Sequence, residues 1–334
     1  MKRALIASLL VMGMALQACA CQSTDVSQET ATSAVSSETT EDTTITTESE
    51  TETTISFTEV VEDYNCVIIY RFENGKDETI LGERYFDSNH NVIKTVTNDT
   101  KGVTYLITEN EYDDRGNVTK TVETHISADD RYTSVDENEY DKDNRLIKTN
   151  VTFSGISGKA TPVHTKYYSY DSKGNLTSIT TKAPDGKISG LELYEYDDAG
   201  NKTKYTQYHG EDELVNMYEY EYDQAGNMIK KSSFRPEGSL MNWTAYEYDS
   251  KGNMTAKITY SHYANGTDEQ GEYLEYEYDS NNNRIKLSRR IPDSDKTYTV
   301  FTYIYDDANN LLRINYFDDN GEVYAWEDYH YEKK

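Results

Sequence analysis

The sequence contains little cysteine, proline, tryptophan or positive charge. Among its 334 residues there are three Cys, four Pro and two Trp, and 33 Lys and Arg stand against 60 Asp and Glu. Outside the first 21 residues only Cys66 remains, so that part of the chain cannot form an internal disulfide. The formal net charge of −27 repels nucleic acid and anionic lipid, which makes both poor partner candidates.

Motifs for catalysis, metal binding and cofactor binding are also missing. The six His residues show no paired spacing of the kind that holds zinc. There is no Gly-x-Ser-x-Gly nucleophile elbow and no phosphate-binding loop. The sequence therefore predicts no catalytic residue, no metal and no cofactor.

The one long apolar run lies at the amino terminus. A basic start, Met1-Lys2-Arg3, precedes an apolar stretch at 4–16 that is too short to span a bilayer comfortably. Small residues and Cys19 follow, which predicts a signal peptide over 1–18 and export from the cell. Leu16-Gln17-Ala18-Cys19 resembles a bacterial lipobox, with Cys21 as a competing register. This resemblance implies a lipid on Cys19 that anchors the protein to the outer side of the cell membrane, and simple secretion is the alternative.

Residues 19–63 have a different composition from the rest of the chain. Between 22 and 59, twenty of 38 residues are Ser or Thr, and the first basic residue after the signal is Arg71. Such a stretch cannot bury enough apolar surface to fold, and its acidic side chains repel one another. We interpret it as a disordered tether.

From residue 64 onward the chain repeats itself. An aromatic residue followed by Asp recurs nine times, at intervals of 26, 28, 30, 26, 26, 26, 30 and 27 residues. The nine aromatics are Phe86, Tyr112, Tyr140, Tyr170, Tyr196, Tyr222, Tyr248, Tyr278 and Tyr305. A fixed period of this size indicates one supersecondary unit that is copied and stacked.

The repeated motif predicts a tight hairpin turn. Asp is favoured at the start of a type I turn, and the residue three positions later is Gly, Asn or His, which tolerate a left-handed backbone. A left-handed residue at that point closes a hairpin with a bulge. The candidate turn residues include Asp113, Gly116, Asn117, Asp171, Gly174, Asp197, Gly200, Asp223, Gly226, Asn227, Asp249 and Gly252.

The segments beside each turn are predicted to be strands. A second tyrosine often stands two residues before the repeat aromatic, as Tyr220 does before Tyr222, so both rings share one face of the strand. If the loop closes as proposed, Tyr222 faces Met228 and Tyr220 faces Lys230 across the hairpin. The opposite face is acidic and exposed to water.

The pattern Tyr-x-Tyr-Asp-x-x-Gly-Asn, as in 220–227, resembles the YD repeat of RHS-type proteins over 64–334. The resemblance implies an all-β fold in which tandem antiparallel hairpins form a β-sheet ribbon, and it implies carbohydrate binding and contact at the cell surface. Most copies here have Gly-Asn where that family often has Gly-Arg. Because no conserved-core or toxin domain follows the repeats, we expect an open, twisted or curved ribbon of about nine repeats with terminal half-units.

The acidic residues allow two chemical interpretations beside a structural one. Pairs such as Glu221 and Asp223 have the separation that glycoside hydrolysis uses, but the pair recurs in other copies, whereas an active site needs one distinctive pair. The loop Asp-x-x-Gly-Asn offers oxygen ligands to calcium, but a calcium loop alternates several acids. We interpret these acids as turn residues and a solvated face.

Four aromatic residues are candidates for contact with a ligand: Tyr208, Trp243, Tyr260 and Trp326. Each lies outside the repeated motif, so each either packs or offers a ring to a ligand such as a sugar. Our leading prediction is a surface-anchored, non-enzymatic binding module with an extracellular glycan as its ligand. A scaffold or assembly protein that binds another protein, such as a surface protein, and that is related to secretion or to polymorphic toxins is the alternative, and an enzyme acting on polysaccharide is third.

Overall fold

The structure, a computed structural model, describes residues 64–333 apart from 74–75, 128–130, 156–157, 293 and 295. This part of the chain is all-β, with twenty strands and no helix that could cross a membrane. The predicted signal peptide and tether, with Cys19 and Cys21, lie outside the described residues. The strands are β1 (Tyr64–Glu73), β2 (Lys76–Phe86), β3 (Val92–Asn98), β4 (Thr104–Tyr112), β5 (Val118–Ile126), β6 (Arg131–Tyr140), β7 (Leu146–Ser154), β8 (Thr161–Tyr170), β9 (Leu176–Lys182), β10 (Ile188–Tyr196), β11 (Lys202–His209), β12 (Glu213–Tyr222), β13 (Met228–Phe234), β14 (Leu240–Tyr248), β15 (Met254–His262), β16 (Asp268–Tyr278), β17 (Arg284–Arg290), β18 (Thr297–Tyr305), β19 (Leu311–Phe317) and β20 (Val323–Lys333).

A turn that starts with Asp joins the two strands of each repeat. At Asp223, the N–H of Gly226 donates to the Asp223 carbonyl at 3.2 Å, and the Asp223 N–H donates to the Asn227 carbonyl at 2.9 Å. These two bonds define a type I turn closed by a bulge, and Gly226 takes the left-handed conformation with φ +88°. Where this position is not Gly it is held at φ 65–67° by His90, Asn144, Asn282 or Asn309. The same pair of bonds closes the turns at Asp87, Asp113, Asp141, Asp171, Asp197, Asp249, Asp279 and Asp306.

The bulge changes one detail of the predicted register. Tyr222 pairs with Met228 as expected, but Tyr220 pairs with Lys231, and the predicted Tyr220–Lys230 pair is wrong. The extra residue is Ile229 on β13, between Met228 opposite Tyr222 and Lys230 opposite Glu221, and it shifts the partner of every earlier residue of β12 by one. Each residue of the first strand, apart from the repeat aromatic itself, therefore pairs with a residue that is one position later in the second strand than counting outward from the turn predicts.

The sheet is closed, and the expectation of an open ribbon is wrong. Every strand pairs antiparallel with its neighbour in sequence, and β1 also pairs with β20, from Tyr64 opposite Lys333 to Glu73 opposite Ala325. An open ribbon would leave the backbone N–H and C=O groups of β1 and β20 unpaired at two edges. Pairing the two ends satisfies them and makes a barrel. The repeated turn does not encode how far each hairpin rotates against the next, so the sequence pattern alone could not show closure.

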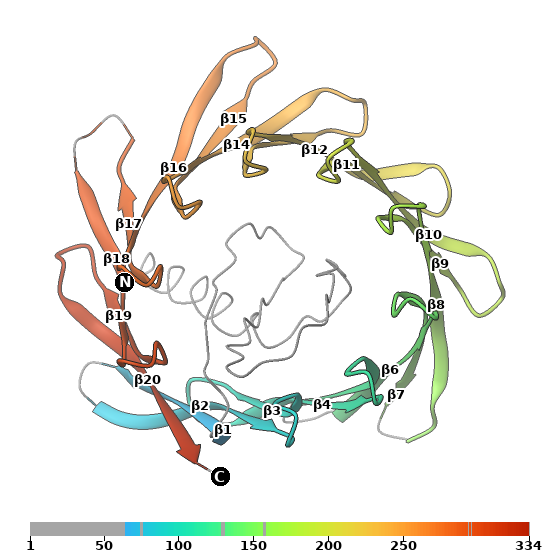
Figure 1. The fold of residues 1–334 in the computed structure, drawn as a ribbon, viewed down its shortest axis with the longest axis horizontal. Helices are drawn as coiled ribbons and strands as arrows, with labels where there is room; N and C mark the ends of the chain where they lie inside the picture. Colours follow the sequence, from blue (N-terminus) through green and yellow to red (C-terminus); the bar gives the residue numbers. More distant parts are fainter. Residues whose placement is uncertain are drawn as a thin grey trace, which may run out of the picture.

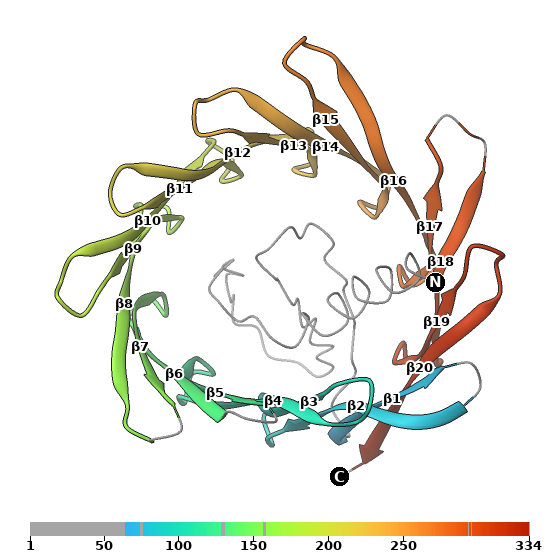
Figure 2. The ribbon, with the colours of Figure 1, turned by 180° about the vertical axis from the view of Figure 1, so that it is seen from behind.

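The two ends of the barrel differ in width. Seen along the axis, the turns that begin with the repeat Asp form an inner circle, and the turns that join successive repeats spread outward (Figure 1). The reverse view shows the same arrangement, with β20 beside β1 (Figure 2). The Asp turns therefore gather at one rim, which we call the turn rim.

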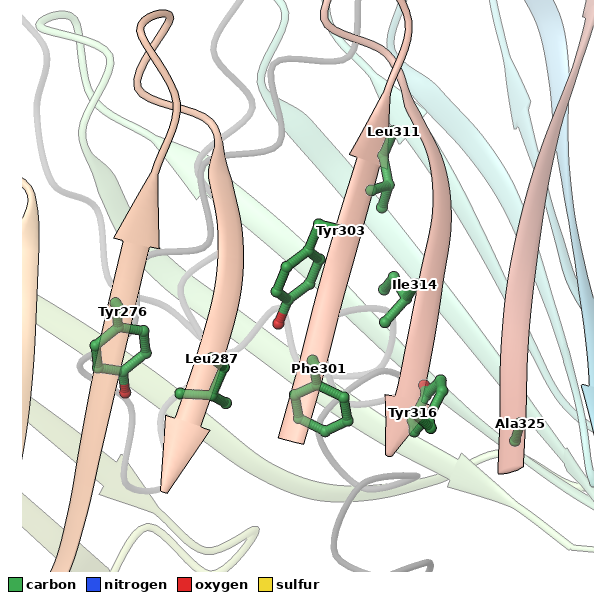
Figure 3. Packing of buried hydrophobic residues seen from close by; sticks show 8 residues of the cluster. All are labelled: Tyr276, Leu287, Phe301, Tyr303, Leu311, Ile314, Tyr316 and Ala325. Carbon is green, nitrogen blue, oxygen red and sulfur yellow. The ribbon is translucent and has the colours of Figure 1, made fainter. Parts of the chain in front are cut away.

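The two faces of the sheet differ in burial. Along β10, Tyr194 is 4 % exposed while its neighbour Leu193 is 37 % exposed and Glu195 is exposed, as period-two alternation requires. We call the face that carries Tyr194 and Tyr196 the aromatic face, and the face that carries Glu195 the charged face, in every strand. On the aromatic face, rings and aliphatic side chains from β16 to β20 pack in one cluster (Figure 3).

A hydrogen bond ties most repeats to the preceding hairpin. The hydroxyl of Tyr222 donates to the carbonyl of Lys202, the first residue of the previous hairpin's second strand, at 2.8 Å. Burial raises the pKa of the equivalent Tyr112, Tyr140 and Tyr170 hydroxyls to about 12, so these groups stay protonated donors. The same bond, at 2.7–3.1 Å, is made by Tyr112, Tyr140, Tyr170, Tyr248, Tyr278, Tyr305 and Tyr331.

Candidate ligand-binding face

The aspartates of the turns are occupied by their own loops. One oxygen of Asp223 accepts the N–H groups of Ala225 at 2.8 Å and Asn227 at 2.9 Å, and the other accepts the Asn227 amide at 2.9 Å. The bond from the Asn227 side chain is the main cause that lowers the pKa of Asp223. Asp249 has the same arrangement with Lys251 and Asn253. These carboxylates are ionised acceptors, and the geometry gives them the turn role that the sequence predicted for them.

Neighbouring turns also touch along the turn rim. The Asn117 amide donates to the Asn144 side-chain oxygen of the next turn at 2.6 Å, and Asn283 does the same to Asn309 at 2.9 Å. The turn at Gly116 therefore contributes to stacking of repeats as well as to reversal of the chain. The remaining turn residues named from the sequence, Gly174, Gly200 and Gly252 among them, have φ values of +93°, +93° and +86°.

The structure brings two of the predicted ligand-facing aromatics together. Trp243 on β14 and Tyr260 on β15 are cross-strand partners on the charged face, and their rings stack with centroids 3.9 Å apart and planes 7° apart. The Lys230 ammonium lies 5.5 Å from the Trp243 ring centre. Both rings are half-buried. Since one face of each ring meets the other, a ligand would contact the outer edges of the pair or displace the Lys230 side chain.

This stack is part of a larger apolar patch. Ile258 lies on the same face of β15, two residues from Tyr260, and is 7 % exposed. Tyr273 of β16 pairs with Ile258, and the Arg290 guanidinium lies 5.0 Å from the Tyr273 ring centre. Burial raises the pKa of Tyr273, and the negative charge of Glu247 adds to this shift. Within β14–β16 the charged face therefore carries an apolar patch. We call its residues, Trp243, Ile258, Tyr260 and Tyr273, the aromatic patch.

Polar groups border the aromatic patch on one side. His262 Nδ1 lies 2.6 Å from a carboxylate oxygen of Asp268, which is its cross-strand partner. This contact is the main cause that lowers the pKa of Asp268, and a hydrogen bond from Trp243 contributes. Trp243 is thus fixed by an indole hydrogen bond as well as by stacking.

A groove at the turn rim lies on the other side. It has a volume of about 590 Å³ and runs between the turns at Asp223 and Asp249, with Ile229 and Glu247 in its wall. Glu247 and Trp243 lie on the same face of β14, four residues or about 13 Å apart at the usual strand rise. Glu247 therefore connects the groove, which Tyr246 and Tyr248 also line, with the face of β14 that carries the aromatic patch, and an extended ligand could contact both.

The other two predicted aromatics lie elsewhere. Tyr208 on β11 is half-buried and pairs with Leu191 and Leu214. Trp326 on β20 is half-buried and lies under the Arg313 guanidinium, 5.4 Å from its ring centre. The structure does not bring either one to the aromatic patch.

Sequence reasoning missed several residues of this region. His262, Asp268 and Tyr273 lie outside the repeated motif, so the period did not mark them. Counting back from the turn at Asp249 with the bulge included pairs residue 243 with 260 and would have joined the two candidate rings. The described residues contain no group of three His, Cys, Asp or Glu side chains that could hold a metal ion.

Comparison with known proteins gives weak likenesses. No protein-family model and no curated protein matches the sequence. The crystal structure of TcdB2-TccC3-Cdc42 contains a chain 12 % identical, with 78 % of this chain and 18 % of that chain covered and a TM-score of 0.33. A porin-like protein from Bacteroides uniformis is 13 % identical, with 64 % and 96 % covered and a TM-score of 0.35. The Photorhabdus luminescens Tc holotoxin pore is 13 % identical, with 75 % and 18 % covered and a TM-score of 0.28. The protein spans less than a fifth of the Tc chains, and likenesses at these scores carry no argument about its function.

Proposed function

We propose that this protein is a non-enzymatic, YD-repeat binding module that recognises a glycan outside the cell. The observation that supports the proposal is that Trp243, which stacks on Tyr260, and Glu247, which lines the groove at the turn rim, lie on the same face of β14. Aromatic rings bind the apolar faces and edges of sugar rings, while carboxylate and amide groups bind the hydroxyls. Trp243, Asp268 and the groove supply both kinds of contact.

The acidic pairs favour binding over catalysis. Glu221 is held by Lys230 at 2.9 Å, and both oxygens of Asp223 accept hydrogen bonds within the turn. The Asn227 side-chain bond lowers the pKa of Asp223, whereas a general acid of a glycosidase needs a raised pKa. A rigid surface that holds a sugar chain without cleaving it needs no such group.

The test is a glycan array probed with the purified wild-type chain and with Trp243→Ala. We expect a specific glycan signal that Trp243→Ala weakens at least about tenfold, since a central aromatic often contributes more than 1.4 kcal/mol. Tyr167→Ala is the control, because Tyr167 is 41 % exposed with the Lys182 ammonium 5.3 Å from its ring centre, on a distant wall. Loss of the signal in both variants would contradict the site.

A protein partner is the second candidate. Ile229, 38 % exposed, lines the groove, and Met241, 39 % exposed, lies two residues before Trp243 on β14; such a partner would cover both. No signal on the array, together with specific capture of one surface protein that Trp243→Ala abolishes, would reverse the order of the two proposals.

Attachment to the cell is part of the same proposal. The lipobox-like Cys19 and the tether at 19–63 support a lipid anchor that displays the barrel outside the membrane. A mass spectrum of the mature amino terminus tests it, with an acylated Cys19 expected. A first residue other than Cys19 or Cys21 would overturn it.

A further inference from the structure

Equivalent positions of the repeats can be compared for one surface ion pair. In four copies the residue before the repeat aromatic is Glu, and it forms an ion pair with a Lys nine positions later, across the turn. The N–O distances are 3.3 Å for Glu111–Lys120, 2.7 Å for Glu139–Lys148, 2.9 Å for Glu221–Lys230 and 2.8 Å for Glu277–Lys286. In four of the five copies that place a lysine opposite this glutamate, the two side chains therefore form an ion pair; the described Glu195 and Lys204, although cross-strand partners, do not.

The copy that contains Glu247 lacks the lysine of this ion pair. Its partner across the turn is Ala256. Among the described residues, no Lys or Arg forms an ion pair with Glu247. Lys251, which lines the same groove, donates to the Asn282 side-chain oxygen at 3.2 Å. Glu247 is thus a carboxylate at an ammonium-binding position without its ammonium.

The surroundings of Glu247 include a groove and aromatic rings. Glu247 forms part of the groove between the Asp223 and Asp249 turns, and it lies close enough to Tyr273 to raise the pKa of that hydroxyl. Tyr273 and Trp243 already hold cations over their rings, Arg290 at 5.0 Å and Lys230 at 5.5 Å. Because cations already lie over these rings, the ammonium of a ligand would contact the Glu247 carboxylate and not the ring faces.

Two of the cations near this site are already neutralised, and Lys251, which lines the groove with Asp223, Glu247 and Asp249, donates to the neutral Asn282 side chain. Lys230 is paired with Glu221 at 2.9 Å and Arg290 with Glu275 at 3.8 Å. Glu247 and Asp268 add negative charge that no described Lys or Arg balances by an ion pair. An acidic sugar would therefore be repelled from this part of the charged face, and a sugar with a positive charge would be attracted.

We infer that the groove binds a glycan that carries free amino groups, and that the ammonium of an amino sugar occupies at Glu247 the place that lysine fills in the other copies. This inference rests on the proposed function and names the class of glycan. The sugar ring lies in the groove toward the aromatic patch, and its ammonium donates to the Glu247 carboxylate. Ala256 matters because a lysine there would compete for the same carboxylate.

The experiment is isothermal titration of the full chain with oligomers of glucosamine and with the same oligomers fully N-acetylated. The two ligands share their sugar backbone and differ in the amine. We expect the wild-type protein to bind the glucosamine oligomer at least about tenfold more tightly, a difference of about 1.4 kcal/mol. Glu247→Gln and Ala256→Lys are each expected to abolish the preference, the first by removing the carboxylate and the second by supplying an internal ammonium.

Glu139→Gln is the matched control, because Glu139 occupies the same repeat position but is already paired with Lys148 at 2.7 Å. It is expected to leave the preference unchanged, and circular dichroism verifies that all variants fold. Equal binding of both oligomers by the wild type, or a preference that survives in Glu247→Gln, overturns the inference and leaves the proposed function standing. Absence of binding to any glycan overturns both. Binding of a lysine-rich peptide that requires Glu247, without binding of glucosamine oligomers, replaces the glycan with a protein as the occupant.

Discussion

The aromatic face is built differently on two walls of the same barrel. On β16 and β18 the position two residues before the repeat aromatic holds Tyr276 and Tyr303, which are 5 % and 8 % exposed and belong to one cluster with Tyr316. On β4 and β6 the same position holds Asn110 and Asn138. Their amides donate to the carbonyls of Val92 and Val118 at 3.0 and 2.9 Å, the same carbonyls that accept the next tyrosine hydroxyls.

The polar wall also contains two half-buried carboxylates. Burial raises the pKa values of Glu123 on β5 and Asp136 on β6, and the charge of Asp136 adds to the shift at Glu123. His125 stacks on Tyr132 with ring centres 4.5 Å apart, and burial lowers its pKa. Strand pairing and turns are nevertheless the same on both walls. The comparison indicates that the turn and the tyrosine-to-carbonyl bond define the fold, while the side chains of the face are free to vary.

Truncation of one buried side chain on each wall should give the largest difference. Tyr316→Ala removes a ring that is 2 % exposed and the hydroxyl that donates to Glu327 at 2.5 Å, and should cost about 4 kcal/mol of unfolding free energy. Asn138→Ala removes hydrogen bonds without a large ring and should cost about 1–2 kcal/mol. Urea unfolding measures both. Equal costs would show that the two walls are stabilised in the same way.

Removal of a turn aspartate should affect both walls equally. Asp113 and Asp279 each accept two backbone N–H bonds at 2.8–2.9 Å and one Asn amide at 2.9–3.0 Å. Asp113→Ala and Asp279→Ala should therefore lower the melting temperature by similar amounts, each less than Tyr316→Ala does. A large effect at one turn and none at the other would show that the turns are not equivalent.

The smallest expected effect is a pH-dependent gain in stability when the Glu123 carboxylate on the polar wall is replaced by a neutral amide. Because burial raises the folded-state pKa of Glu123 above its ordinary 4.5, its contribution to stability is present below that pH and is lost as pH rises through the folded-state pKa. Glu123→Gln, which stays neutral, should melt higher than the wild type at pH 7 and equally at pH 4. Glu277→Gln on the other wall, at an exposed ion pair with Lys286, is the control and should change little at either pH. A variant that melts lower than the wild type at pH 7 would mean that the Glu123 carboxylate is stabilising.

The local structure could be predicted from the sequence because the residues of each repeat specify its turn and its strands. Asp223 and Gly226 specify the turn, and the alternation of Tyr220, Glu221 and Tyr222 specifies the strand and its two faces. The Tyr220 partner was missed by one residue because a bulge adds length to one strand only. These features are short-range, and short-range rules of turn chemistry and strand period describe them.

Closure of the sheet and assembly of the site are long-range and were not accessible in the same way. The pairing of β1 with β20 depends on the curvature summed over all hairpins. No sequence pattern within Tyr64–Glu73 indicates that this strand pairs with the last one. It places Arg71 against Glu327, 3.5 Å apart and both almost fully buried, although the two are far apart in the sequence. Trp243 and Tyr260 were each named from the sequence, but their stacking depends on a register that the bulge sets.

Closure is tested most directly by amide hydrogen exchange of β1 and β20, followed by mass spectrometry at neutral pH. In a closed barrel the amides of both strands are paired on two sides, and they should exchange as slowly as those of interior strands such as β10 and β11. Rapid exchange along one side of β1 and of β20, with protection retained in β10 and β11, would show that the sheet is open.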